Sequence, residues 1–353
     1  MSARRIAACF GALALLAAGV VSSAVAGPTN DAVPAGYRIT PAGRQVDVPR
    51  FPLGVAPTPD GSKVLVSADN GFIPQLTVID AKTLSSTSTP SANLFMGVSA
   101  TPDGRVFASG GNADRVFRYQ LQGDSAVSQD VTQSPAILPL HNFRDGIELQ
   151  ATGDAQSLPA GDGIHTGGGY PGNSALDGRF LYVAGTLSEP SGKGADACPS
   201  GQPACGRVIV IDTMTDAVVR RVPVGYDAYG LAIDSARHRL YASNWADESG
   251  RGGSTGGTVS VVDVTNPATA REISFTRVGH HPTAVQLTAD KTRLFVANTN
   301  DDTISVLDVG GAGAPTVVTT ESVRPAPGIP VGAYRTPSPS RPTAAGCSSP
   351  SPA

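Results

Sequence analysis

One short pattern recurs along this chain, and its recurrence restricts the fold more than any other feature. Its clearest copy is HPTAVQLTADKTRLFVANTNDDTISVLD, residues 281–308, which reads as three short strands joined by two polar turns. A lone three-stranded sheet buries too little apolar surface to be stable, so it needs copies of itself beside it. Further copies begin near residues 54, 97, 172 and 229. The sequence therefore predicts a repeat protein built from small sheets.

The spacing of the copies indicates the kind of repeat. Each copy has an aspartate at what we interpret as equivalent places in the first turn, namely Asp60, Asp103, Asp177, Asp234 and Asp290. These aspartates are separated by 43, 74, 57 and 56 residues, as expected for a unit of roughly forty residues with variable loops. Units of this length with several strands are typical of propeller blades. We therefore predict an all-β fold, a β-propeller with five recognisable blades, within residues 46–334.

Two of the copies support a resemblance to a known family. The segments LFVANTNDDTISVLD, residues 294–308, and residues 59–80 resemble the YVTN-type β-propeller repeat. The resemblance covers about residues 50–323 and is most similar to YncE-like propellers. It implies a parent ring of seven blades, and in one bacterial group such a propeller precedes a phosphoesterase of the alkaline phosphatase superfamily. No phosphatase segment is visible in these 353 residues. The resemblance is specific for architecture and weak for chemistry, because one fold hosts many functions.

Residues 1–26 have the organisation of a secretory signal peptide. Two arginines precede an apolar run from Ile6 to Val21, and Ala-Val-Ala at residues 24–26 fits a cleavage site. The apolar run is short for a membrane span. We expect a secreted or extracytoplasmic protein, at the cell surface or in the periplasm, with no membrane span after signal removal. Residues 27–45 then form a polar leader.

Composition agrees with an exported all-β protein and limits its partners. The 41 glycines and 29 prolines suit many turns, and charged residues make up only 16% of the chain, with a formal net charge of −3. Such a surface has no strong electrostatic footprint for nucleic acid. We expect no nucleic-acid partner and no cofactor, and the partner is an unknown small molecule or protein.

Cys198 and Cys205 flank the segment PSGQPA in a long insert of the third repeat. In an exported chain this spacing predicts a disulfide, which contributes ~2–2.5 kcal/mol for so short a loop. The alternative, a pair of metal thiolates, lacks a second cysteine pair or a close histidine.

Motifs for catalysis are sparse. The chain contains no G-x-S-x-G nucleophile elbow, and the glycine run GDGIHTGGGY, residues 161–170, lacks the ending of a phosphate loop. We interpret residues 125–169 as the end of the second blade and a long surface loop, with a possible strand at 146–150. The adjacent His280 and His281 point to opposite faces if they lie on a strand, so they do not form a metal pair. No catalytic or metal residue is assigned.

One set of positions is a candidate ligand site. The innermost strand of each blade lines the propeller channel, so the residues just before it surround the mouth. Aromatic, histidine and charged residues recur there, which suits a polar-aromatic funnel, although the aromatic rings could instead wedge blades together. Trp245, the only tryptophan, either closes over a ligand or packs under residues 246–257. The candidates are Arg50, Phe51, Tyr170, Tyr226, Asp227, Tyr229, Trp245, His280 and His281, and Phe95 holds a similar place in the second blade.

Residues 335–353 do not continue the repeat. GIPVGAY, residues 328–334, resembles the start of a sixth blade, but the segment after it has no strand periodicity, as in a disordered Pro/Ser tail. Back-translation of residues 335–352 with G- or C-ending codons, read two bases later, regenerates a blade opening similar to TAVQLTADKTRLFVA. We therefore interpret the tail as a frameshift product and the sixth blade as truncated. Uncovered apolar faces favour association, so we expect this chain to be poorly soluble or oligomeric.

The sequence leaves two functions open. The first is a binding or scaffold module outside the cell. The second is an enzyme, either a propeller lactonase or the N-terminal part of a phosphoesterase. A lactonase needs acidic, Asn or His ligands that converge on the channel, and the sequence does not place them.

Overall fold

The structure is a computed structural model that describes residues 43–69, 74–91, 93–130, 163–246 and 256–323. Residues 43–47 belong to an N-terminal unit, Met1–Asp47, and the remaining described residues belong to a second unit that begins at Val48. The expected signal peptide, the strand at 146–150 and the tail at 335–353 lie outside the described residues. Within the described ranges, no helix has the length and apolar character needed to cross a membrane.

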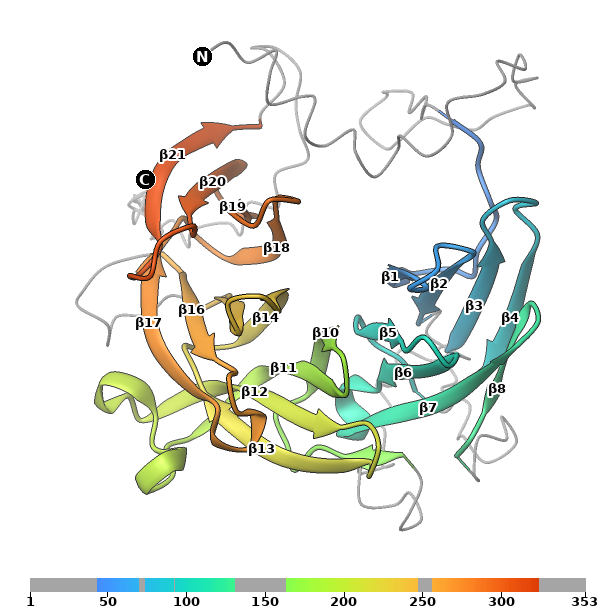
Figure 1. The fold of residues 1–353 in the computed structure, drawn as a ribbon, viewed down its shortest axis with the longest axis horizontal. Helices are drawn as coiled ribbons and strands as arrows, with labels where there is room; N and C mark the ends of the chain where they lie inside the picture. The colour runs from blue at the N-terminus through green and yellow to red at the C-terminus, as the bar shows by residue number, and fades with distance from the viewer. Residues whose placement is uncertain (1–42, 70–73, 92, 131–162, 247–255, 324–353) are drawn as a thin grey trace, which may run out of the picture. The chain divides into compact units, whose positions relative to one another are not determined.

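The described part of the second unit forms five antiparallel sheets, each with its four main strands in chain order (Figure 1). The first blade comprises β1 (Pro52–Pro57), β2 (Lys63–Ala68), β3 (Gln75–Asp80) and β4 (Ser86–Pro90). The second comprises β5 (Val98–Ala100), β6 (Arg105–Ser109), β7 (Arg115–Gln122) and β8 (Ser125–Ser128), with β9 (Ile164–His165) paired to β7. The third comprises β10 (Pro171–Asp177), β11 (Phe180–Pro190), β12 (Ala204–Asp212) and β13 (Ala217–Pro223). The fourth comprises β14 (Ala228–Asp234), β15 (Arg239–Asn244), β16 (Thr258–Asp263) and β17 (Arg271–Arg277). The fifth comprises β18 (Pro282–Leu287), β19 (Arg293–Asn298), β20 (Thr303–Asp308) and β21 (Thr316–Ser322). The predicted all-β propeller with five blades is confirmed.

Each blade has one strand more than the three that the repeat pattern predicted. The additional strand is the outermost one, and its sequence is polar or only weakly patterned, as in STSTP of β4 and TVVTTES of β21. Nearly every residue of these two strands is exposed. An outermost strand pairs along one edge and packs on little else, so it needs no apolar run and leaves no hydrophobic signal in the sequence.

The apolar core lies between blades. Four buried clusters each join two consecutive blades, and β12 contributes to two of them. Ile209 packs toward the second blade, while Val208 and Val210 pack toward the fourth. Because successive side chains of a strand alternate between its faces, a strand buried on both sides needs apolar residues at every position. This explains why GRVIVID and similar segments read as continuous apolar runs.

Three inner strands approach the next blade through a glycine. A Cβ added to Gly54 would lie 1.8 Å from the Met96 carbonyl oxygen, and one added to Gly230 would lie 2.2 Å from the Thr283 carbonyl oxygen. A Cβ added to Gly97, directly before β5, would likewise lie 2.2 Å from a carbonyl oxygen of β10. Only glycine permits backbones to approach so closely. These glycines therefore set the distance between blades.

Blades contact each other in chain order through their inner strands, from β1 to β5, β10, β14 and β18. Figure 1 shows these strands around a common centre. Within the part of the unit that the structure describes, β18 and β1 share no contact of comparable extent.

The turn aspartates fall into two groups rather than one. Asp60 accepts hydrogen bonds from the Thr58 hydroxyl (2.6 Å) and the Ser62 backbone N–H (3.1 Å), and Asp290 has the same arrangement. The Thr58 hydroxyl, followed by the Ser62 groups, lowers the pKa of Asp60 to about 2. Asp177 and Asp234 are instead the last residues of β10 and β14. The predicted equivalence of all five aspartates is therefore wrong, because the turns differ in length.

Candidate functional site

Four residues that directly precede inner strands share an unusual backbone conformation. Phe51, Tyr170, Asp227 and His281 have φ values of 54°, 55°, 52° and 48°. In each case the carbonyl accepts a backbone hydrogen bond of 2.9–3.1 Å. For Phe51, Asp227 and His281 the donor directly follows the second strand of the blade, whereas for Tyr170 the donor lies within β11. The pairing register of the inner strand shifts directly afterwards. A left-handed backbone costs a non-glycine residue on the order of 1–3 kcal/mol. The fold therefore holds these four residues in a backbone conformation that they would not prefer by themselves.

All four residues lie at the same end of their blades. Neighbouring strands are antiparallel, so the start of each inner strand, the end of the second strand and the start of the third coincide. We call this end the entrance face and define it by Phe51, Tyr170, Asp227, His281 and the loop residues bonded to them. The four were among the residues that the sequence analysis selected.

Trp245 and His281 form the clearest side-chain pair on the entrance face. Their rings are 4.2 Å apart with an interplanar angle of 31°, although the residues come from different blades. Trp245 is 38% exposed. Two buried polar atoms near this pair have no hydrogen-bond partner among the described residues. They are Nδ1 of His281 and Oδ1 of Asn244, the residue that precedes Trp245. Residues 247–255 lie outside the described ranges, so the choice between a lid and a packing role for Trp245 stays a prediction.

His280 has a separate partner. Its Nδ1 lies 2.8 Å from Asp301 Oδ1, and its backbone N–H donates to Asp301 Oδ2 at 2.7 Å. The imidazole is partly exposed. His280 and His281 therefore contact different groups, as expected for neighbouring residues. No three His, Cys, Asp or Glu side chains form a metal cluster in the described ranges.

Asp227 and Tyr170 are held by contacts with other blades that the sequence did not predict. Asp227 Oδ1 accepts hydrogen bonds from the Ser188 backbone N–H (2.9 Å) and hydroxyl (2.8 Å) of the third blade. Tyr170 packs edge-on against Phe95, with ring centroids 5.0 Å apart. Burial, with a smaller contribution from the charge of Asp69, raises the pKa of Tyr170. These contacts cross between blades, so no local pattern could have indicated them.

The remaining candidates are less closely associated. Arg50 is exposed, and Phe51 is 69% exposed. Tyr226 is half-buried, and Tyr229 lies within β14 rather than before it. Burial raises the pKa of Tyr229.

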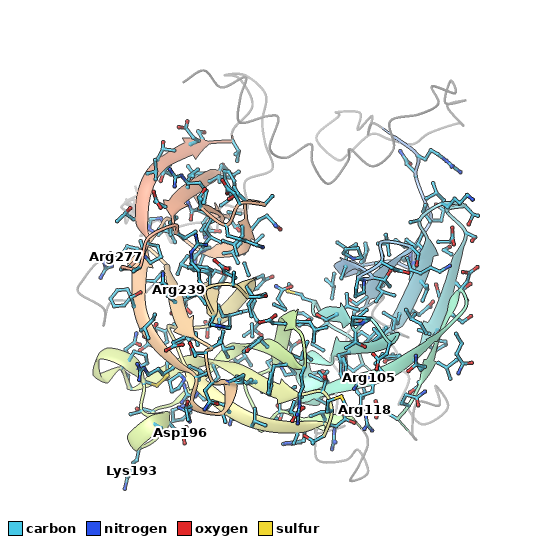
Figure 2. The ribbon with its side chains drawn as sticks, in the orientation of Figure 1. Arg105, Arg118, Lys193, Asp196, Arg239 and Arg277 are labelled. Atoms are coloured by element: carbon cyan, nitrogen blue, oxygen red, sulfur yellow. A yellow bond between two sulfur atoms is a disulfide. The ribbon has the colours of Figure 1, made fainter. Side chains whose placement is uncertain are left out.

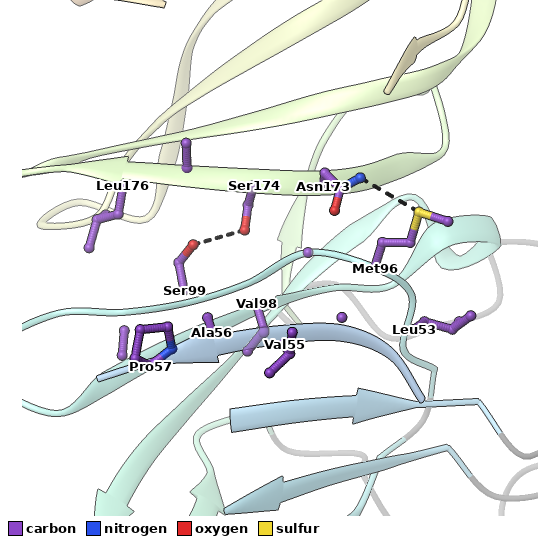
Figure 3. A pocket seen from close by; sticks show the side chains of 14 residues that line it. Leu53, Val55, Ala56, Pro57, Met96, Val98, Ser99, Asn173, Ser174 and Leu176 are labelled. Carbon is purple, nitrogen blue, oxygen red and sulfur yellow. Dashed lines mark hydrogen bonds between the residues drawn. The ribbon is translucent and has the colours of Figure 1, made fainter. Parts of the chain in front are cut away.

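Inner strands of the first three blades line a cleft of about 430 Å³, which Figure 3 shows from close by. Its walls come from β1, β5, β10 and the two residues before β5, and its polar side chains are Ser99, Asn173 and Ser174. The Ser99 and Ser174 hydroxyls are hydrogen-bonded across it at 2.9 Å, and Asn173 Nδ2 lies 3.7 Å from the Met96 sulfur. The repeat pattern predicts that the innermost strands line the channel, but it indicates none of these residues.

No protein-family model matches this sequence, and a search of curated proteins finds no match. Among solved structures, the chain is similar to a functionally unknown protein from Desulfotomaculum acetoxidans, with a TM-score of 0.52, 14% identity, and coverage of 76% of this chain and 71% of that chain. It is also similar to the periplasmic gluconolactonase PpgL of Pseudomonas aeruginosa, with a TM-score of 0.47, 16% identity and coverage of 77% and 70%. A 6-phosphogluconolactonase candidate from Bacteroides uniformis gives a TM-score of 0.44, 15% identity and coverage of 82% and 89%. At these identities the comparisons concern the fold alone.

Proposed function

We propose that this chain is an extracytoplasmic β-propeller of the YVTN-repeat type that binds a small molecule or a protein segment at its entrance face. The observation that carries the proposal is the left-handed backbone of Phe51, Tyr170, Asp227 and His281. Glycine adopts this conformation without strain. A chain that has aromatic, acidic and histidine side chains there accepts a cost in stability, and strain of this kind clusters at ligand sites. The disulfide between Cys198 and Cys205 supports the extracytoplasmic location.

The Trp245–His281 pair suggests the chemistry of the ligand. A partly exposed indole offers a flat surface for a sugar ring, an aromatic ring or a planar side chain. Asn244, whose Oδ1 is unpaired among the described residues, precedes Trp245 in the chain, and His281, whose Nδ1 is also unpaired there, packs against the indole. Buried polar atoms usually have a partner, and a ligand or an ordered water can supply it. A ligand with one flat face and a polar edge fits both features.

Tryptophan fluorescence tests the proposal directly, because Trp245 is the only tryptophan in the chain. The protein would be titrated with a panel of sugars, lactones, phosphoesters and short peptides while the emission of Trp245 is followed. We expect saturable quenching or a spectral shift with at least one class. His281→Ala should weaken that binding about tenfold or more, as expected when a central aromatic contact is truncated.

His238→Ala is the matched control. His238 is also a histidine with a left-handed backbone (φ 52°), but it lies in the turn between β14 and β15, at the opposite end of the blade. This variant should bind like the wild type. If no class of compound changes the emission, or if both histidine variants bind normally, the site lies elsewhere.

A hydrolase is the second candidate, and the His280–Asp301 pair is the observation that favours it. In the tautomer that donates Nδ1–H to Asp301, the Nε2 atom is left unprotonated and can take a proton from an attacking water. Ring opening of a lactone panel, followed by acid release, tests this activity. His280→Gln should abolish turnover while Trp245 still reports binding. Turnover that survives this substitution would exclude the pair as the general base.

A further inference from the structure

The disulfide of the third blade has a buried cation beside it. Cys198 and Cys205 are bonded, as the sequence predicted, with their Cα atoms 5.7 Å apart. Arg207, on β12, is 4% exposed. Its Nη1 is in close contact with Cys205 Sγ and lies 3.7 Å from Cys198 Sγ. The guanidinium group therefore faces both sulfur atoms.

Among the described residues, no carboxylate lies within hydrogen-bonding distance of Arg207. The nearest is Glu189, whose Oε2 lies 4.0 Å from Arg207 Nε and only 2.5 Å from Arg221 Nη2. Asp196 pairs with Arg220 at 3.1 Å. Glu189, Asp196, Arg220 and Arg221 are the charged groups that act on Arg207.

The Arg207 guanidinium donates to main-chain carbonyls instead, at 3.0 Å to Cys205 and 3.1 Å to Gly206. Burial lowers its pKa, which reflects the cost of a buried cation without a bonded counter-ion.

A thiolate would supply that counter-ion. A positive charge near a cysteine stabilises the thiolate over the thiol, and stabilising the reduced form makes a disulfide easier to reduce. We propose that Arg207 primes the Cys198–Cys205 disulfide for reversible reduction by a thiol, with Cys198 as the attacked sulfur and Cys205 as the leaving thiolate. The third blade then carries a thiol-exchange site rather than an inert crosslink.

The exchange proceeds in two balanced steps. A thiolate of the reductant attacks Cys198 Sγ, the bond to Cys205 breaks, and its electron pair leaves with Cys205 as a thiolate beside Arg207. A second thiolate of the reductant then attacks the reductant sulfur of the mixed disulfide. Cys198 is released and takes up a proton from solvent, and the reductant becomes a disulfide. The protein thereby gains two electrons, which the two thiols supply.

Burial and position assign these roles to the two sulfurs. Cys205 is fully buried on β12, whereas Cys198 is 6% exposed and precedes the short η8 turn (Pro199–Gly201) of the surface insert. The more accessible sulfur is the one that a thiol can reach. The sulfur that leaves fastest is the one whose thiolate is most stabilised. Both criteria select attack at Cys198.

Reduction would alter the outer edge of the third blade. The insert between β11 and β12 folds back through η7 (Gly194–Asp196), and Figure 2 shows Lys193 and Asp196 at this outer edge. With Arg207 and the edge of β13, it lines a cavity of about 520 Å³. Without the disulfide, the insert is held by hydrogen bonds such as Cys198 N–H to Ser191 Oγ (3.0 Å) and by the ion pair between Asp196 and Arg220 (3.1 Å). Exchange at Cys198 therefore couples thiol chemistry to the shape of this cavity.

Equilibration of the full-length protein with reduced and oxidised glutathione tests the proposal. The fraction of reduced protein is read by acid quenching, alkylation and mass spectrometry between pH 6 and 8. The equilibrium constant for reduction of the disulfide by glutathione does not change with pH below the pKa of the protein thiol. Above that pKa it rises tenfold per pH unit, as long as the pH stays below the ordinary thiol pKa of about 8.5. We expect the rise to begin below pH 8 in the wild type. At limiting glutathione, the mixed disulfide should be found on Cys198.

Variants separate charge from structure. Arg207→Gln should move the rise above pH 8 and lower the equilibrium constant for reduction at pH 8 about tenfold, because a nearby opposite charge shifts a pKa by about 1–3 units. Arg207→Lys should retain most of the wild-type profile. Arg220→Gln is the control, because Arg220 holds the same insert through Asp196 but contacts neither sulfur. A wild-type equilibrium that is flat to pH 8, or identical pH profiles for the wild type and Arg207→Gln, would overturn the proposal.

Discussion

Gly230→Ala tests whether the close approach of inner strands determines the stability of the propeller. A Cβ at this position would lie 2.2 Å from the Thr283 carbonyl oxygen of the next blade, about 1 Å short of ordinary contact at 3.4 Å. It would also lie 3.1 Å from Ser243 Oγ. Backbone cannot move aside as a side chain can, so the fourth and fifth blades must separate locally.

The magnitude follows from three contributions. Overpacking of a tight interface costs about 1–3 kcal/mol. The Ser243 hydroxyl accepts from Gly230 N–H (2.8 Å) and donates to the Thr283 carbonyl (2.6 Å), and weakening this buried link costs about 1 kcal/mol. Loss of glycine entropy in the unfolded chain offsets about 0.4–1 kcal/mol. We expect the free energy of unfolding to fall by about 2–3 kcal/mol.

Urea unfolding followed by circular dichroism measures this change, with Gly311→Ala as the control. Gly311 has no heavy atom within 4 Å of an added Cβ and is not among the residues with positive φ. Its substitution should leave stability within about 0.5 kcal/mol of the wild type. If Gly230→Ala is as stable as Gly311→Ala, then the blades are not packed as closely as the structure indicates, and the argument fails.

Three further predictions concern the whole chain. Free-thiol labelling of the native protein without reductant should leave Cys198 and Cys205 unmodified, and Cys205→Ser should lower stability by about 2 kcal/mol in chemical denaturation. Hydrogen bonds from hydroxyl and backbone groups lower the pKa of Asp60 and Asp290 to about 2. Since these folded-state pKa values lie below the ordinary value of 3.8, the stabilisation is fully present above about pH 4 and is lost as the pH falls toward 2. Asp290→Asn should flatten the acid limb of the stability profile, and an unchanged limb would contradict this assignment. Light scattering should find this chain oligomeric or aggregated, and a monodisperse, cooperatively melting monomer would contradict this prediction.

The candidate site was only partly predictable. Sequence position identified Tyr170, Asp227 and His281 as residues at blade entrances, because the repeat pattern locates the start of each inner strand. Sequence position gave no indication of their left-handed backbone. That conformation accompanies the hydrogen bond that each carbonyl accepts from the second strand or the residue directly after it, and the register shift that follows. It also could not pair Trp245 with His281, since the two rings meet only when neighbouring blades pack.

The sequence by itself determined the interior of this fold. Strands such as GRVIVID and LFVAN are apolar at successive positions because both faces of a middle strand are buried, and the turns between them carry Asp and Gly that bond or bend the local backbone. These requirements act between residues close in sequence, and the sequence of each repeat meets them independently. Hence the repeat, the five blades and the cysteine pair were readable without coordinates.

Only the tertiary structure decided the outer strands and the chemistry of the sites. An outer strand such as β4 is held by backbone hydrogen bonds to β3, and this pairing does not require particular side chains. His280 meets Asp301, and Arg207 meets both sulfurs of the disulfide, through contacts that the fold brings together. Propensity and periodicity act along the chain, whereas the position of one side chain against another depends on how strands pair and blades pack in three dimensions.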